Sequence, residues 1–200
     1  MTGMKLLLAS NNEKKLRELR DILAGLGHEV VSLREAGIAS DPEETGETFE
    51  ENALIKARSA CALSGLPAVA DDSGLAVDAL GGAPGVRSAR YCLGSDADRV
   101  AFLLKNMEGV PDGKRTARFV SAIACVFPDG KELSVRGECE GIILRAPRGD
   151  GGFGYDPVFY SPGEGLTFAQ IPPERKNAIS HRSRALFAFV KRLKKELPPA

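Results

Sequence analysis

Hydrophobic and polar residues alternate along the chain with two different periods, and these periods predict the secondary structure. Residues 5–10, KLLLAS, form a short apolar run that is typical of a buried strand. In residues 11–27, leucines recur every three or four positions before Gly27, which predicts a helix with a glycine cap. Residues 29–33, EVVSL, predict a second short strand. This order of elements is typical of an α/β protein.

The middle of the chain continues the alternation. Residues 34–48 have no apolar period and predict a loop. A helix follows over residues 48–65, where Thr48 and Glu51 have the spacing of a capping box. Residues 67–80 predict an extended segment with a break at the polar sequence DDSG.

The second half predicts a different arrangement. Residues 95–109 predict a helix, and residues 115–144 predict two long strands joined at the hairpin turn PDG. Residues 146–165 are rich in Gly and Pro and predict a loop, and residues 177–197 predict an amphipathic helix. We therefore expect a mixed sheet flanked by helices, in one domain over residues 1–200.

Composition narrows the class of protein. The chain is 43% hydrophobic and 27% charged, as in ordinary globular proteins, and its 27 basic residues equal its 27 acidic ones. The absence of a basic excess argues against a nucleic acid polymer as partner. The four cysteines form no CxxC pair, so a zinc site or disulfide framework is not expected. The N-terminal apolar run is too short for a signal peptide or membrane span, so we expect a cytoplasmic protein with no membrane partner.

Two polar stretches suggest that the protein binds phosphates and a metal ion. At SNNEKK, a strand leads directly into a helix start, which is a site for anions, although Lys14 and Lys15 are also explained as exposed lysines. The pairs at 43–44 and 71–72 offer carboxylates of the kind that Mg²⁺ shares with substrate phosphates. A solvated loop is the alternative for the first pair, and a turn for the second.

Two further stretches suggest recognition of a flat ring. In GGFGYDPVF, glycines allow close approach of a ligand, and Phe153 and Tyr155 offer flat faces for stacking. The alternative is a simple turn with core aromatics. In ERKNAISHRSRAL, Ser180 or Asn177 caps the last helix and cationic side chains gather at its start. Asn52 and Lys56 share one face of the second helix at i, i+4 spacing. The alternative is an ordinary pair of surface residues.

Five motifs in order resemble the inosine triphosphate pyrophosphatase family over nearly the whole chain: SNNEKKLREL, EETGETFEENALIKA, ADDSGLAVDALGGAPGVRSARY, GGFGYDPVF and KNAISHRSRAL. The resemblance implies Mg²⁺-dependent hydrolysis of ITP, dITP and XTP to the monophosphate and pyrophosphate. It also implies a homodimer and an elongated α/β fold in two lobes with a central cleft.

The resemblance also assigns roles to residues of this chain. Asp72 would be the general base with Lys56 as a second catalytic residue, and Glu43 or Glu44 would hold the metal together with Asp72. The substrate-binding residues that it implies are Ser10, Asn11, Asn12, Glu13, Lys14, Lys15, Ser73, Phe153, Gly154, Tyr155, Asp156, Lys176, His181 and Arg182.

Three other functions fit parts of this pattern. A related pyrophosphatase for pyrimidine or modified nucleotides would carry similar charges and would differ in its substrate. A nucleotide-sensing module without turnover would not need a carboxylate aimed at water. A protein–protein adaptor would leave the Gly-rich loop and the two cationic helix starts unexplained.

Overall fold

The computed structural model describes residues 4–10, 16–17, 19–20, 23 and 27–196. The chain divides into two compact units, each of which is described by itself. Unit 1 comprises residues 1–72, 122–136 and 185–200, and unit 2 comprises residues 73–121 and 137–184. Within the described ranges, no helix is both long enough and apolar enough to cross a membrane.

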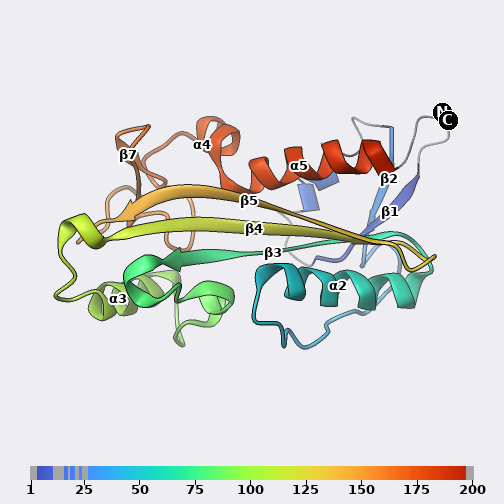
Figure 1. The fold of residues 1–200 in the computed structure, drawn as a ribbon, viewed down its shortest axis with the longest axis horizontal. Coiled ribbons are helices and arrows are strands. Elements are labelled where there is room, and N and C mark those ends of the chain that lie inside the picture. The colour runs from blue at the N-terminus through green and yellow to red at the C-terminus, as the bar shows by residue number, and fades with distance from the viewer. Residues whose placement is uncertain (1–3, 11–15, 18, 21–22, 24–26, 197–200) are drawn as a thin grey trace. The chain divides into compact units, whose positions relative to one another are not determined.

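The described strands form one mixed sheet with the order β2-β1-β3-β4-β5-β6-β7 (Figure 1). Strand β1 pairs in parallel with β2 and β3, whereas β6 is antiparallel to both β5 and β7. The predicted mixed sheet is therefore confirmed. The strands are β1 (Lys5–Leu8), β2 (Glu29–Ser32), β3 (Ala68–Val77), β4 (Thr116–Val126), β5 (Glu132–Ile143), β6 (Phe159–Ser161) and β7 (Leu166–Thr167).

In unit 1, helices lie on both faces of the sheet. Helix α2 (Phe49–Ser64) lies on one face, and most of α5 (His181–Glu196) lies on the other (Figure 1). Apolar side chains of α5 pack together with Leu16, Leu19 and Leu23 and with those of β1 and β4 in one buried core. Gly27 has a φ of 81°, and the N–H of His28 donates to the carbonyl of Leu23, as expected at a helix end capped by glycine.

Unit 2 has its own apolar core. Helix α3 (Asp96–Asn106) contributes Val100 and Leu103 to it, and the short helix α4 (Pro173–Ile179) lies farther along the chain. Three short 3₁₀ segments connect the larger elements, at Asp78–Leu80, Gly85–Arg90 and Asp112–Lys114. The core also contains Leu75, Val77, Met107, Ala117, Phe119, Cys139, Ile143, Tyr155, Val158, Phe159, Phe168 and Ile171.

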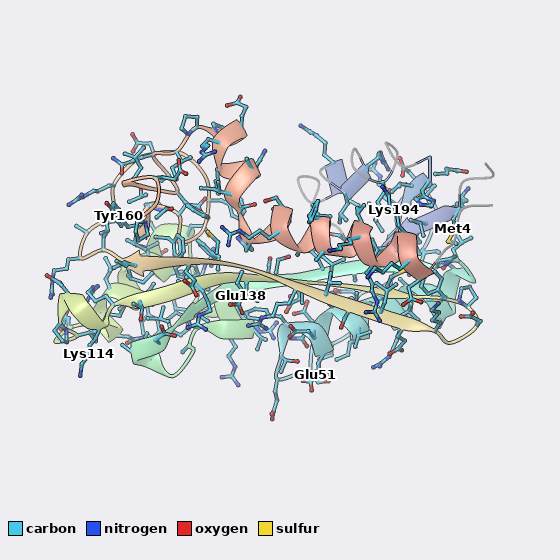
Figure 2. The ribbon with its side chains drawn as sticks, turned by 45° about the horizontal axis from the view of Figure 1, so that its top comes forward. Met4, Glu51, Lys114, Glu138, Tyr160 and Lys194 are labelled. Carbon is cyan, nitrogen blue, oxygen red and sulfur yellow. The ribbon has the colours of Figure 1, made fainter. Side chains whose placement is uncertain are left out.

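The helix signals in the sequence were informative. The predicted capping box is present at the start of α2, where the hydroxyl of Thr48 accepts from the N–H of Glu51 and the Glu51 carboxylate accepts from the N–H of Thr48. Figure 2 labels Glu51 on this helix. Ser95 and Asp98 form the same arrangement at the start of α3.

Three expectations about the elements were wrong. Strand β3 runs without interruption through DDSG, so the predicted break is absent. The predicted loop over residues 146–165 contains strand β6. The predicted last helix over residues 177–197 is two helices, α4 and α5, which meet at Ser180.

Candidate functional site

The adjacent carboxylates on β3 are buried, and a lysine of α2 lies beside them. Asp71 and Asp72 are 3% and 8% exposed. The Nζ atom of Lys56 lies 3.0 Å from Oδ1 of Asp72 and 3.3 Å from Oε1 of Glu44. Buried carboxylates are costly unless a cation meets them, and Lys56 is that cation. We call Lys56, Glu44, Asp71 and Asp72 the acid cluster.

The acid cluster keeps Lys56 charged. Burial alone would lower the pKa of Lys56, but the negative charges of Asp72, Asp71 and Glu44 outweigh it and raise that pKa above its usual value. Three carboxylates around one ammonium group leave an excess of negative charge when all are ionised. Such an excess is complementary to a second cation.

The loop that carries Glu44 is held against α2 by Asn52. The fully buried Asn52 accepts a hydrogen bond of 2.8 Å from the N–H of Gly46 through its Oδ1 atom. A Cβ atom at position 46 would lie only 2.7 Å from that oxygen, so glycine permits the close approach. Lys56 lies one helical turn beyond Asn52, on the same face, as the i, i+4 spacing predicts.

The donor set fits a magnesium ion that arrives with phosphates. Among the described residues, no group of three or more His, Cys, Asp or Glu side chains is placed to hold a metal ion. Glu44 and Asp72 contact the same ammonium group, whereas Glu43 is exposed. Mg²⁺ is usually bound through one or two carboxylates, and substrate phosphates and water complete its shell. Of the two candidates at 43 and 44, Glu44 is therefore better placed.

The first predicted phosphate motif begins beside the acid cluster. Strands β1 and β3 are parallel, with Leu8 opposite Val69, and the N–H of Ala9 donates to the carbonyl of Val69, so the two segments continue in the same direction toward Ser10 and Asp71. Ligands of α/β sheets bind at the carboxyl ends of parallel strands. Ser10 is half-buried there, and Ser73 is half-buried next to Asp72. The other predicted residues of this motif, Asn11, Asn12, Glu13, Lys14 and Lys15, lie outside the described residues.

Unit 2 carries a second lysine, Lys176 of α4, whose surroundings differ. Its Nζ atom hydrogen-bonds to the buried carboxylate of Asp156 and lies 4.8 Å from the ring centroid of Phe153. Phe153 is 48% exposed, so its ring can accept a flat partner. Lys176 also lies 5.5 Å from the ring centroid of Phe168. We call Phe153, Asp156 and Lys176 the ring cluster.

The Gly-rich loop is shaped around Asp156. The N–H of Phe153 donates to Oδ2 of Asp156 at 2.8 Å. Gly152 has a φ of 75°, and a Cβ atom there would lie 2.1 Å from the same oxygen. A side chain at position 152 would therefore be strained and would displace the carboxylate that Lys176 contacts.

Tyr155 does not offer its ring to a ligand, which corrects the expectation of two stacking faces. Its side chain is buried in the core of unit 2, and its hydroxyl donates to the carbonyl of Ser88 at 2.8 Å. Burial raises the pKa of the Tyr155 phenol. The Ser88 hydroxyl in turn accepts from the N–H of Leu75 on β3. Tyr155 and Ser88 thus tie the Gly-rich loop to β3.

His181 and Arg182 form the first turn of α5. Ser180 caps this helix, since its hydroxyl accepts from the N–H of Ser183, whereas Asn177 lies within α4. The imidazole of His181 stacks on Phe119 with 5.0 Å between ring centroids. Phe119 stacks on Phe168, the ring that Lys176 faces, so one aromatic layer contacts both the His181 ring and Lys176.

Several residues that shape the site were not predicted as part of it. Phe119 and Phe168 look like ordinary core residues in the sequence, and Ser88 lies in a short 3₁₀ segment without a distinctive pattern. Asp96, whose carboxylate accepts a hydrogen bond from the N–H of Gly154, reads only as an acidic residue in the first turn of a helix. No period or spacing marks such contacts between distant segments.

Comparisons with known proteins identify the family of this chain. The model of the Ham1 family matches residues 6–192. A dITP/XTP pyrophosphatase of Symbiobacterium thermophilum is 57% identical over 193 residues, which is 96% of each chain. Another dITP/XTP pyrophosphatase, from Thermus thermophilus, is 48% identical over 200 residues, which is 100% of this chain and 96% of the relative.

Solved structures lead to the same family. A HAM1 protein from Coxiella burnetii matches with a TM-score of 0.90 and 44% identity, covering 96% of this chain and 99% of that one. A nucleoside-triphosphatase, or dITP/XTP pyrophosphatase, of Mycobacterium abscessus matches with a TM-score of 0.82 and 51% identity, covering 94% and 99% of the two chains. The family expected from the five motifs is confirmed, and this chain belongs to the Ham1 family.

Proposed function

We propose that this chain is a Mg²⁺-dependent nucleoside triphosphate pyrophosphatase that hydrolyses dITP, XTP and ITP to the monophosphate and pyrophosphate. The observation that carries the proposal is the acid cluster, in which Lys56 contacts both Glu44 and Asp72. The names of the relatives support dITP and XTP as substrates. The motif resemblance adds ITP, Mg²⁺ and a homodimer, and we retain a cytoplasmic location as part of the proposal.

The acid cluster would carry out the phosphate chemistry. Glu44 and Asp72 would hold Mg²⁺, which when bound neutralises phosphate charge and favours departure of pyrophosphate. Asp72 would accept a proton from a water molecule while the oxygen of that water molecule attacks the α-phosphorus. The bond from the α-phosphorus to the bridging oxygen breaks, and pyrophosphate leaves. Lys56 would stabilise the negative charge on the phosphate oxygens.

The ring cluster would recognise the base. The exposed ring of Phe153 would stack on the purine, and Lys176, His181 and Arg182 would supply hydrogen-bond donors. Hypoxanthine and xanthine carry an oxygen acceptor at position 6, which such donors can meet. Adenine carries an amino group there and would leave the donors unpaired, which is a strong basis for its rejection.

Product analysis with dITP, XTP, ITP, dATP, dGTP and dTTP, with and without Mg²⁺, tests this function. We expect monophosphate and pyrophosphate from dITP, XTP and ITP, and only when Mg²⁺ is present. Turnover of dTTP in their place would assign the chain to pyrimidine nucleotides. Tight binding of dITP without any turnover would make the chain a nucleotide-sensing module and contradict the proposal.

A further inference from the structure

The Gly-rich loop lies over a hollow that side chains do not fill. This hollow of about 430 Å³ is bordered by α3, through Ala97, Val100, Ala101 and Leu104, and by residues 150–154 of the loop. Apolar contacts beneath a segment usually fix its position, and a gap removes many of those contacts. The position of this loop therefore depends more strongly on the hydrogen bonds at its edges.

Two successive amides of the loop are held by carboxylates from different elements. The N–H of Phe153 donates to Asp156, within the loop itself. The N–H of Gly154 donates to Oδ2 of Asp96 at 2.7 Å, and Asp96 is the first residue of α3. The two amides belong to the successive peptide units on either side of the Phe153 Cα atom. The two hydrogen bonds consequently restrict the backbone that carries the exposed Phe153 ring.

The Asp96 carboxylate is itself fixed in place. Its Oδ1 atom accepts a hydrogen bond of 2.6 Å from Arg99, whose other terminal nitrogen donates to the carbonyl of Gly94. The hydrogen bond from Arg99, followed by that from the Gly154 N–H, lowers the pKa of Asp96. A charged acceptor makes the stronger class of hydrogen bond to an amide. Asp96 therefore joins the start of α3 firmly to the loop.

We propose that Asp96 is a positioning residue for base recognition, which holds the Phe153 ring in place for stacking through the amide of Gly154. This inference rests on the proposed function, because it assigns Phe153 to the base of the nucleotide. The described side-chain hydrogen bonds of Asp96 are with Gly154 and Arg99, which belong to neither cluster, and the role that we propose for it involves no proton transfer. Its loss should therefore change base recognition and leave the phosphate chemistry intact.

The test compares Asp96→Ala with two variants of matched design. Asp96→Asn keeps an oxygen acceptor for the Gly154 amide while it removes the charge. Asp98→Ala lies on the same helix and breaks the capping box with Ser95, but it leaves the Asp96 contact in place. Hydrogen exchange of residues 151–157 is expected to be several-fold faster in Asp96→Ala than in either of the other two.

Kinetics then separates positioning from general damage. Asp96→Ala should raise KM for dITP by about five- to tenfold, as expected for loss of a charged hydrogen bond, with kcat within about twofold of wild type. Asp96→Asn should have a KM for dITP close to that of wild type, and Asp98→Ala should retain the wild-type KM. Binding of inorganic tripolyphosphate, which has no base, should be the same in all variants.

The outcomes distinguish this proposal from the function on which it rests. Wild-type protein that leaves dITP and XTP intact would overturn the function, whatever the exchange data show. Active wild type together with an unchanged KM in Asp96→Ala would overturn the role of Asp96 alone. Equal loss of dITP and tripolyphosphate binding in Asp96→Ala would also contradict it, because that result indicates general damage to the fold.

Discussion

The acid cluster of unit 1 and the ring cluster of unit 2 are both built on a lysine beside a buried aspartate, yet their surroundings differ. Lys56 is surrounded by the carboxylates of Asp72, Asp71 and Glu44. Lys176 contacts one carboxylate, that of Asp156, and faces the rings of Phe153 and Phe168. A lysine–aspartate pair is therefore accompanied by excess negative charge in the acid cluster and by a flat, donor-bearing surface in the ring cluster.

This difference shows why a lysine–aspartate contact does not by itself indicate a function. Excess carboxylate is suited to a divalent cation and the phosphates that share it. An aromatic face beside an ammonium group is suited to a planar ring with an acceptor. The neighbours of each pair are therefore the reason why we propose phosphate chemistry for one cluster and base recognition for the other.

The largest effect is expected from Asp72→Asn. Loss of a general base typically lowers kcat by about 10²- to 10⁴-fold, and the amide also removes a charged metal ligand. Steady-state hydrolysis of dITP measures it, with circular dichroism as the check on folding. Asp71→Asn is the matched control on the neighbouring residue, and its kcat should fall much less. Equal losses in the two variants would mean that Asp72 has no special role.

A large effect on stability is expected from Lys56→Met. Removal of this cation leaves buried carboxylates without their main partner, which costs about 3 kcal/mol of unfolding free energy. Arg58→Met is the control on the same helix. Its exposed pair with Glu132 should be worth less than about 1 kcal/mol. Urea unfolding measures both variants, and a smaller loss for Lys56→Met than for Arg58→Met would contradict the account.

The stability difference should also depend on pH in a defined direction. The pKa of Lys56 is raised on folding, so its contribution is complete below the unfolded pKa of about 10.4 and is lost as the pH rises through the folded value. The gap between wild type and Lys56→Met should therefore stay constant from about pH 7 to 9 and shrink above about pH 10.4.

A smaller effect is expected from the two neighbouring glutamates, and it separates them. Glu44→Gln should raise the Mg²⁺ concentration needed for half-maximal hydrolysis of dITP by about tenfold, since one charged ligand is lost. Glu43→Gln should leave that concentration unchanged, because Glu43 is exposed and lies outside the acid cluster. The reverse order would move the metal ligand from Glu44 to Glu43.

Much of the fold was predictable because it depends on local signals. The capping residue Thr48 is where the sequence predicts it, and the helix has its glycine cap at Gly65, the last residue of the predicted range. The break expected at DDSG was wrong, because Asp and Ser interrupt a strand through local hydrogen bonds from the side chain to the backbone, and other partners can replace those bonds. In the structure, Lys56 and the neighbouring strands hold that segment extended. Tertiary contacts of this kind override local preference.

The site was predictable in its residue types but not in its contacts. The motifs indicated Lys56, Asp72 and Lys176, whereas the pairing of Lys176 with Asp156 joins positions twenty residues apart. Tyr155 and Phe153 are equally aromatic in the sequence, and only burial shows that Phe153 alone presents a face. Asp96 joins Gly154 across 58 positions, a distance over which no sequence period operates.

The central claim is that Lys56 acts on the phosphates and Lys176 acts in base recognition. Kinetics of both lysine variants with two substrates tests it most directly. The measurement is the ratio of kcat/KM for dITP to that for dATP in Lys56→Met and Lys176→Met. We predict that Lys56→Met lowers kcat/KM by the same factor for both substrates and so keeps the ratio. Lys176→Met should lower kcat/KM far more for dITP than for dATP and so reduce the ratio. A ratio that falls in Lys56→Met, or that stays unchanged in Lys176→Met, would contradict the account.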